Sequence, residues 1–303
     1  MTLRAVISIG TNSTRLLVAD LCENEVPQIV VARSIGTRIG QGLGDAGCLS
    51  DEAMQRTLAA VAEYAAAAGE RTTDVSAIST SALRRAQNGA EFAARVRAVC
   101  DVPLHIVGGD EEARLSFLGA VAALDPSGSY GVLDVGGGSS EYATGSHDRV
   151  EASTSFEIGA VRLTERVPEL AGASAIVNAS AVLRGRAIAR DALRPLSGFP
   201  RVDRMLLVGG SATTAAAMLR ASRDPFERFP LSRKDLRRAV ERIAELPLAA
   251  RRRVAGLNPQ RADIVLGGLL ILETAMELCE HEAAIVSAND LLLGYLLFGR
   301  ANV

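Results

Sequence analysis

The sequence is poor in residues on which several common kinds of site depend. It has no tryptophan, a single lysine (Lys234) and three histidines that stand far apart, at positions 105, 147 and 281. A Walker A loop requires a lysine directly after its glycine, and Lys234 follows an arginine. The scattered histidines argue against a histidine metal site or a Ser-His triad. The composition therefore excludes a Walker A nucleotidase and disfavours a triad hydrolase.

Cysteine, net charge and long apolar runs are also scarce. The four cysteines, at positions 22, 48, 100 and 279, show no close pairing or metal-ligand spacing, which is typical of reduced thiols. With 33 Lys+Arg against 35 Asp+Glu, the net charge is −2, so no global field attracts nucleic acid or a membrane surface. The most apolar stretch, residues 264–279, is interrupted by Glu273 and is too short to span a bilayer. No secretory signal pattern precedes the first expected strand. These features predict a cytoplasmic protein with no nucleic-acid or membrane partner.

Glycine, by contrast, is plentiful and is concentrated in loops. The segment VLDVGGGSSE (132–141) is an apolar run with one acid, followed by three glycines and two serines. Glycine lets another group approach the main chain, and a row of inward N–H groups with added hydroxyls forms an anion nest. The next residues alternate as a strand does, whereas a P-loop or Rossmann turn would continue into a helix. The pattern predicts a strand–loop–strand phosphate hairpin, with a plain tight turn as the alternative.

The same hairpin pattern occurs near the N-terminus, in AVISIGTNSTRLLVA. Gly10 and Gly136 are 126 residues apart, as are Ser8 and Asp134. Two halves that open with the same hairpin predict a duplicated fold with a cleft between its domains. The best linker is DPSGS, residues 125–129.

The remaining pattern alternates strands and helices. In the first half we expect strands at 5–10, 15–21, 76–80 and 104–108, and helices at 50–69, 90–100 and 110–124. The second half continues with a further hairpin, a glycine loop at 209–211 that leads into a helix, a strand at 283–287 and a last helix at 291–298. Segment 36–44 is expected to be a mobile loop near the cleft. The basic run 232–254 is either a solvated helix face or a track for a long polyanion.

Six motifs, in order, resemble those of the exopolyphosphatase / guanosine pentaphosphate phosphohydrolase (Ppx/GppA) family of the actin-like ATPase superfamily. They are IGTNSTRLLVAD, TSALRRAQN, GGDEEARLSFLGA, LDVGGGSSE, VGGSATT and RADIVLGGLLILE. The resemblance covers essentially the whole chain. It implies an α/β fold of two actin-like (ribonuclease H-like) domains with an interdomain cleft, at 1–125 and 126–303, whose last helix can pack back on the first domain.

The resemblance also implies an activity, a metal and site residues. The implied activity is release of terminal phosphate from inorganic polyphosphate, or from guanosine pentaphosphate, with Mg²⁺ or Mn²⁺, by a homodimer. Glu112 corresponds to the general base, Arg84 to a phosphate-binding arginine and Asp134 to a metal ligand. The phosphate-binding loops correspond to Gly10, Thr11, Asn12 and Ser13, to Gly136, Gly137, Gly138 and Ser139, and to the third loop, Gly209, Gly210 and Ser211.

Residue type alone offers a simpler interpretation of Glu112, because a glutamate in a helix's first turn stabilises the helix dipole. Glu111 is explained equally well in that way. Adjacent helical residues point about 100° apart, so at most one of the two should face the cleft.

The chain departs from the family pattern at Ser8, where the family has aspartate, and after Ser287, where VSANDLLLGYLL lacks the usual glycine and arginine. A hydroxyl brings no charge to a hard cation. We therefore predict weak activity with a high magnesium requirement. The alternative function is a weakly active or inactive homologue that binds or senses a phosphorylated ligand.

Overall fold

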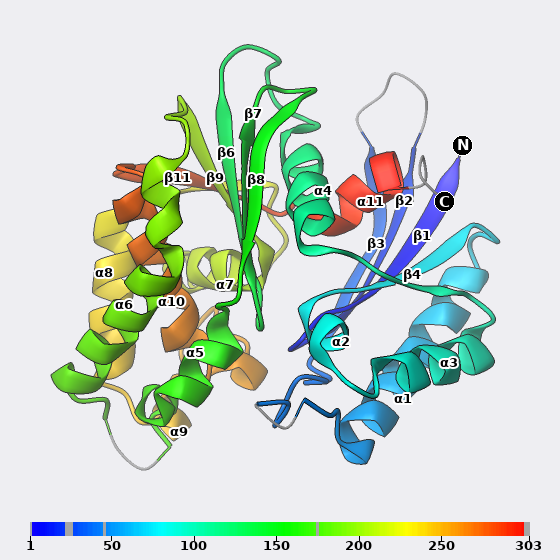
Figure 1. Ribbon diagram of the computed structural model, residues 1–303, viewed down its shortest axis with the longest axis horizontal. Coiled ribbons are helices and arrows are strands. Elements are labelled where there is room, and N and C mark those ends of the chain that lie inside the picture. Colours follow the sequence, from blue (N-terminus) through cyan, green and yellow to red (C-terminus); the bar gives the residue numbers. More distant parts are fainter. Residues whose placement is uncertain (1, 22–26, 45–46, 174–175, 300–303) are drawn as a thin grey trace.

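Two mixed β-sheets, one in each half of the chain, form the framework of the fold (Figure 1). The computed structural model describes residues 2–21, 27–44, 47–173 and 176–299. Cys22, one of the four predicted thiols, lies outside these residues. In the described part of the chain, Cys48, Cys100 and Cys279 are free thiols, as expected.

The first sheet has the strand order β3-β2-β1-β4-β5. Its strands are β1 (Leu3–Ile9), β2 (Thr14–Asp20), β3 (Gln28–Ile35), β4 (Val75–Ser79) and β5 (Leu104–Ile106). The first three strands pair antiparallel, whereas β4 and β5 run parallel to β1. In the β1–β2 hairpin Ser8 lies directly opposite Arg15. The buried run of β1 reflects its position at the centre of the sheet, covered on both faces.

The second sheet repeats this order and adds one strand. It runs β10-β11-β9-β6-β7-β8, and its strands are β6 (Tyr130–Val135), β7 (Ser140–Gly145), β8 (Val150–Phe156), β9 (Arg204–Val208), β10 (Arg228–Ser232) and β11 (Ala283–Ser287). Here β8-β7-β6-β9-β11 corresponds to β3-β2-β1-β4-β5, with the same antiparallel and parallel pairings. The predicted duplication of the fold is therefore confirmed.

Helices cover both sheets. In the first half they are α1 (Asp51–Gly69), α2 (Ser81–Arg85), α3 (Gly89–Cys100) and α4 (Gly109–Val121). In the second half they are α5 (Ala160–Arg166), α6 (Ala179–Leu193), α7 (Gly209–Arg220), α8 (Arg233–Ala244), α9 (Leu248–Arg251), α10 (Val265–Leu278) and α11 (Leu291–Phe298), with short 3-10 turns η1 (Pro168–Ala171), η2 (Arg194–Gly198) and η3 (Pro259–Arg261). Ser50 caps α1 as predicted, since its side chain accepts a hydrogen bond from the Ala53 amide.

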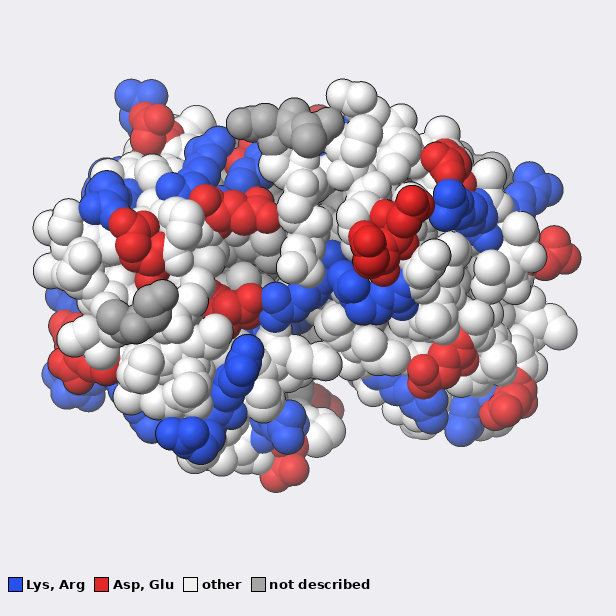
Figure 2. Space-filling view, turned by 90° about the horizontal axis from the view of Figure 1, so that it is seen from below, with Lys and Arg blue, Asp and Glu red and all other residues white. Residues whose placement is uncertain are grey.

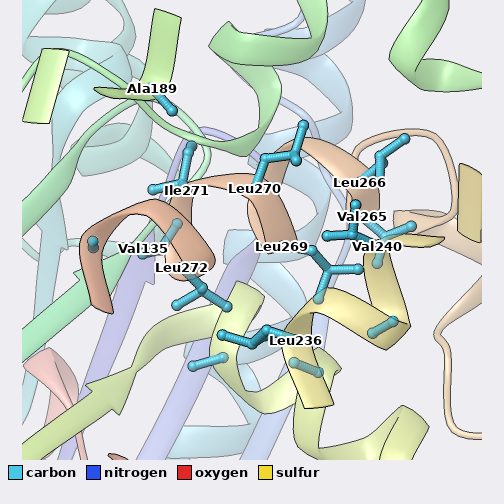
Figure 3. Close-up of a cluster of buried hydrophobic side chains, with 14 of the residues drawn as sticks. Val135, Ala189, Leu236, Val240, Val265, Leu266, Leu269, Leu270, Ile271 and Leu272 are labelled. Carbon is cyan, nitrogen blue, oxygen red and sulfur yellow. The ribbon is translucent and has the colours of Figure 1, made fainter. Parts of the chain in front are cut away.

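The core of the second half is built around α10. Its leucines pack against α8, through Leu236 and Val240, and against Ala189 of α6 (Figure 3). This helix is almost entirely buried because it is sandwiched between the sheet and the outer helices. Among the described residues no helix combines the length and apolar character that crossing a membrane requires.

Helices α4 and α11 lie between the two sheets (Figure 1). Helix α4 packs against β6, β7 and β8 of the second half, although it precedes the linker. Helix α11, the last of the described chain, packs against α4, β1 and β2. Because α4 packs on the sheet of the second half and α11 on the sheet of the first, the domain division at residues 125 and 126 stays a prediction.

Three sequence expectations need correction. Strands β3 and β10 were not predicted; β3 has an exposed, weakly alternating pattern typical of a sheet edge. The basic run 232–254 is no single helix, and its Arg251 is fully buried, donating to the carbonyls of Leu170, Ile243 and Leu246. Segment 36–44 is no free loop, since Ile39 and Leu43 are buried in the first core.

Candidate active site

A small cavity of about 90 Å³ lies where the two halves meet. The first half lines it with Ser8, Gly10, Thr11, Asn12, Ser13, Arg15, Thr80 and Glu112. The second half contributes Asp134, Val135, Gly136, Gly137, Gly138, Ser139, Ala160, Gly209, Gly210, Ser211, Arg261, Ile264, Leu291 and Leu292. Every residue predicted for the phosphate loops, the base and the metal ligand therefore lies on one cavity. Of the predicted site residues only Arg84 is absent from its wall.

The two glycine hairpins face each other across this cavity, as the repeat predicts. Both close with the same hydrogen bond: the Gly10 amide donates to the Ser13 carbonyl at 3.0 Å, and the Gly136 amide to the Ser139 carbonyl at 3.1 Å. A Cβ at Gly137 would lie 3.1 Å from the Thr11 Cβ, so the loops are almost in contact. The missing side chain lets them approach each other.

The third glycine loop closes a further side of the cavity at the start of α7. Gly209 has φ +80°, and a Cβ there would lie 2.1 Å from Asp134 Oδ1. Glycine is thus required twice over, by the left-handed backbone and by the neighbouring carboxylate. The helix expected after the glycine loop at 209–211 is confirmed by α7, which follows β9 directly.

Glu112 reaches the cavity from the first turn of α4. Its carboxylate is buried, and Oε2 accepts a hydrogen bond from Arg84 Nη1 at 2.5 Å. Burial raises the pKa of Glu112 to about 7, against the opposing effect of the Arg84 charge and hydrogen bond. Glu111 points elsewhere, with its Oε2 3.7 Å from His105 Nε2. Only one of the two faces the cavity, as the helical spacing requires.

Arg84 lies behind Glu112. Its Nη1 also donates to the Val107 carbonyl at 2.8 Å, and its Nη2 is 3.8 Å from Glu141 Oε1. The guanidinium therefore lies between two buried carboxylates and fixes the orientation of Glu112. Direct contact of Arg84 with a phosphate stays a prediction.

Asp134 is the last residue but one of β6 and lines the cavity. Its Oδ2 accepts a hydrogen bond from Ser116 Oγ at 2.9 Å. Burial, and then the nearby Asp290 charge, raise the pKa of Asp134 to about 6. Glu141 lies opposite Asp134 on β7, and burial raises its pKa well above the usual range, with further contributions from Glu112 and Asp134. Ser155 Oγ donates to this carboxylate at 2.7 Å.

Sequence reasoning missed two arginines that line the cavity. Arg15 pairs with Asp290 at 2.6 Å, and Arg261 Nη2 donates to Ser13 Oγ at 3.1 Å. Burial, and then the charges of Arg15 and Arg38, lower the pKa of Arg261 to about 10. The signals were available: Arg15 is the cross-strand partner of Ser8, and Arg261 opens the RADIVLGGLLILE motif. Glu141, which lies within LDVGGGSSE, is a further residue without a predicted role; it does not line the cavity but lies 3.8 Å from Arg84 Nη2.

The donor set fits one divalent cation only with substrate present. The described residues hold no cluster of three or more His, Cys, Asp or Glu side chains that would bind a metal unaided. Asp134 is nevertheless a buried carboxylate at the cavity with a raised pKa, so a cation would stabilise its charged form. Mg²⁺ is commonly held by one or two carboxylates together with substrate phosphates. Asp134 can supply that single carboxylate, whereas Ser8 adds only a neutral hydroxyl.

Comparison with known proteins agrees with this geometry. The model of the Ppx/GppA phosphatase family matches residues 17–297. The chain is 33% identical to exopolyphosphatase 2 of Mycobacterium tuberculosis over 317 aligned residues, which cover 97% of each chain. It is 27% identical to a bifunctional 3-dehydroquinate synthase/phosphatase of Fusobacterium nucleatum, of whose length it spans only 47%.

Solved structures give the same result. The crystal structure of an exopolyphosphatase from Cytophaga hutchinsonii superposes with a TM-score of 0.88 at 25% identity, covering 98% of this chain and 97% of that one. The Aquifex aeolicus member of the Ppx/GppA family superposes with a TM-score of 0.79 at 28% identity, covering 98% and 96%.

The fold and the cavity define a two-domain protein of the actin-like class, with glycine hairpins from both halves facing one small polar site. Within that class, the chain belongs to the Ppx/GppA phosphatase family.

Proposed function

We propose that this protein is a phosphohydrolase that releases the terminal phosphate of inorganic polyphosphate. The observation that carries the proposal is the position of Glu112, a buried carboxylate with a pKa near 7, on the same small cavity as two opposed glycine hairpins. The two glycine hairpins alone, which together form a phosphate cage (residues 10–13 and 136–139), would indicate a phosphate-binding protein. A base poised near neutral pH beside that cage indicates hydrolysis.

The cage binds the terminal phosphate through backbone amides, hydroxyls and two arginines. The loop residues at 10–13 and 136–139 offer main-chain N–H groups at a turn, a geometry that suits an anion. Arg15 and Arg261 add positive charge from opposite halves of the chain. Because a guanidinium fork matches phosphate oxygens, these two side chains would neutralise the substrate and fix its orientation.

The chemistry then requires little from the protein beyond alignment and charge. Glu112 in its ionised form accepts a proton from a water, whose oxygen attacks the terminal phosphorus in line with the bridging oxygen that leaves. The bond between that phosphorus and the bridging oxygen breaks, giving inorganic phosphate and a chain one unit shorter. Arg84 holds Glu112 in place through the 2.5 Å hydrogen bond.

A divalent cation, Mg²⁺ or Mn²⁺, would be held by Asp134 and the phosphate oxygens of the substrate. When bound, it would neutralise charge on the phosphoryl group that is transferred. The family resemblance extends the proposal to a cytoplasmic protein that forms a homodimer. Light scattering after gel filtration would test the dimer.

Two alternatives share this site. Guanosine pentaphosphate also ends in a phosphoanhydride, so the same cage and base would act on it. A binding or sensing protein with poor turnover is favoured by Ser8, which removes a carboxylate from the first hairpin.

The test is phosphate release from polyphosphate and from guanosine pentaphosphate across a magnesium titration. Glu112→Gln should lower kcat by on the order of 10²–10⁴, the usual contribution of a general base, with little change in substrate affinity. Glu111→Gln is the matched control and should be nearly silent, because that side chain faces away from the cavity beside His105. Equal losses in the two variants would contradict the assignment of the base, and no wild-type turnover on either substrate would favour the sensor.

A further inference from the structure

Segment 36–44 joins β3 to α1 and is anchored on the first glycine loop. The Arg38 amide donates to the Asn12 carbonyl at 2.9 Å, and the Gly40 amide to the Thr11 carbonyl at 3.0 Å. Ile39 is completely buried in the core of the first half. The segment therefore moves with the first half and with its phosphate loop.

From this anchored segment Arg38 reaches across to the second half. Its Nη1 and Nη2 donate to the two carboxylate oxygens of Asp263 at 2.6 and 2.9 Å, and Nη2 also donates to the Gln260 carbonyl at 2.5 Å. The Arg38 backbone is left-handed, with φ 52°, a conformation that is uncommon for a residue with a side chain. A bidentate pair, made from a strained backbone between two halves, is a specific contact. We refer to Arg38, Gln260 and Asp263 as the clamp.

The clamp lies directly beside the cavity. Gln260 and Asp263 flank Arg261, which lines the cavity and donates to Ser13. Figure 2 shows the lower end of Figure 1, where Lys and Arg side chains meet at the junction of the two halves. With the clamp formed, the volume of this open cavity is only about 90 Å³. A long polyphosphate has to extend out of this volume between the halves.

We propose that the Arg38–Asp263 pair determines which chain lengths the protein hydrolyses efficiently. The inference rests on the proposed function. Short polyphosphates are enclosed with the clamp formed, so the pair contributes to their transition state by excluding water and fixing both loops. Long chains hold the halves apart and gain nothing from the pair. The clamp therefore favours short substrates.

The proposal is tested by measuring kcat/KM on two substrates of different chain length, tripolyphosphate and long-chain polyphosphate. Arg38→Ala and Asp263→Ala should each lower kcat/KM on tripolyphosphate by about fivefold, the upper range for a partly exposed pair, and leave the long chain within about twofold. The exchanged variant, Arg38→Asp with Asp263→Arg, should restore the tripolyphosphate rate. Equal losses on both lengths would overturn the proposal. So would a loss in Arg38→Ala alone, which would make Arg38 a phosphate ligand.

A second readout needs no turnover. Because the chain lacks tryptophan, Gln41→Trp places a single tryptophan, which can be excited selectively over the tyrosines, at an exposed position of segment 36–44. Tripolyphosphate should change its emission with the clamp intact and leave it unchanged when Asp263→Ala is added. If tripolyphosphate changed the emission of the Asp263→Ala variant as much as it does with the clamp intact, the clamp would be refuted. Absence of hydrolysis in the wild type would refute the proposed function, while the fluorescence would still test closure.

Discussion

The two glycine hairpins share one backbone but carry opposite charges. Their turns close with the same amide-to-carbonyl bond, three residues apart in each. At matching positions, however, the first hairpin pairs Ser8 with Arg15 and the second pairs Asp134 with Glu141. The first hairpin thus brings a hydroxyl and a guanidinium to the cavity, whereas the second brings the carboxylate of Asp134, and Glu141 is buried outside the lining.

This difference shows how the two halves of a duplicated fold can keep the same backbone geometry and differ in the role of their side chains. The shared backbone supplies amide donors of the same geometry on both sides, which suits a phosphate whichever wall it approaches. The side chains at the strand ends then differ in role. In the proposed function, Arg15 of the first hairpin would attract the substrate, Asp134 of the second would hold a metal ion, and Glu112 of α4 would act as the base.

The largest expected difference is between substitutions at the two matched positions, Ser8 of the first hairpin and Asp134 of the second. Asp134→Ala should lower kcat by on the order of 10², as does the loss of an electrostatic group at a reacting centre, whereas Ser8→Ala should change it little. The reason is that, of these two residues, only Asp134 can bring a charge to the cavity. Steady-state phosphate release at saturating magnesium measures both. Similar losses in the two variants would show that the hairpins are functionally equivalent.

The pH dependence of kcat/KM should report the ionisation of Glu112. Burial raises the Glu112 pKa to about 7, and Arg84, Asp134 and Glu141 are the charged groups around it. Because only the ionised carboxylate accepts a proton, kcat/KM should rise about tenfold per pH unit below 7 and level off above it. The profile of Glu112→Gln should lack this limb, and that of Glu111→Gln should keep it. A limb that survives in Glu112→Gln would belong to the substrate or to another group.

Converting the first hairpin toward the second should have a smaller effect. Ser8→Asp adds a carboxylate to the cavity, so the magnesium concentration for half-maximal activity should fall by about tenfold, or 1.4 kcal/mol. Arg15, directly opposite, limits the gain by pairing with the new acid. Phosphate release measured against magnesium concentration for both forms decides the matter. An unchanged magnesium dependence would mean that position 8 does not contact the cation.

The smallest effect is expected far from both hairpins, on α8. Arg237 pairs with Glu273 at 3.4 Å, and none of the arginines of α8 lines the cavity. Replacing Arg237, Arg238 and Arg242 by alanine should therefore leave the ratio of long-chain to short-chain activity, and its salt dependence, unchanged. A selective loss on long chains would restore the polyanion-track interpretation of this helix.

Local signals predicted much of the fold. The 126-residue repeat predicted both hairpins and their meeting at one cleft, because glycine–hydroxyl loops between buried strands leave few alternatives. Ser50 marked the start of α1. Strand β3 was missed because an edge strand lacks a strong burial pattern. Segment 36–44 was taken for a mobile loop because its glycines dominate the local pattern, whereas Ile39 and Leu43 anchor it.

By itself the sequence determined the backbone of the site: which residues form the loops, and that at most one of two adjacent glutamates can face inward, since glycine content and helical spacing are local properties. Only the tertiary structure decided the electrostatics. Arg15, Arg261, Glu141 and Asp290 are distant in sequence, and their distances set which carboxylate is buried, which is paired and which can act as a base. Burial and Coulomb interactions depend on positions in space, so they arise only when the two halves close on each other.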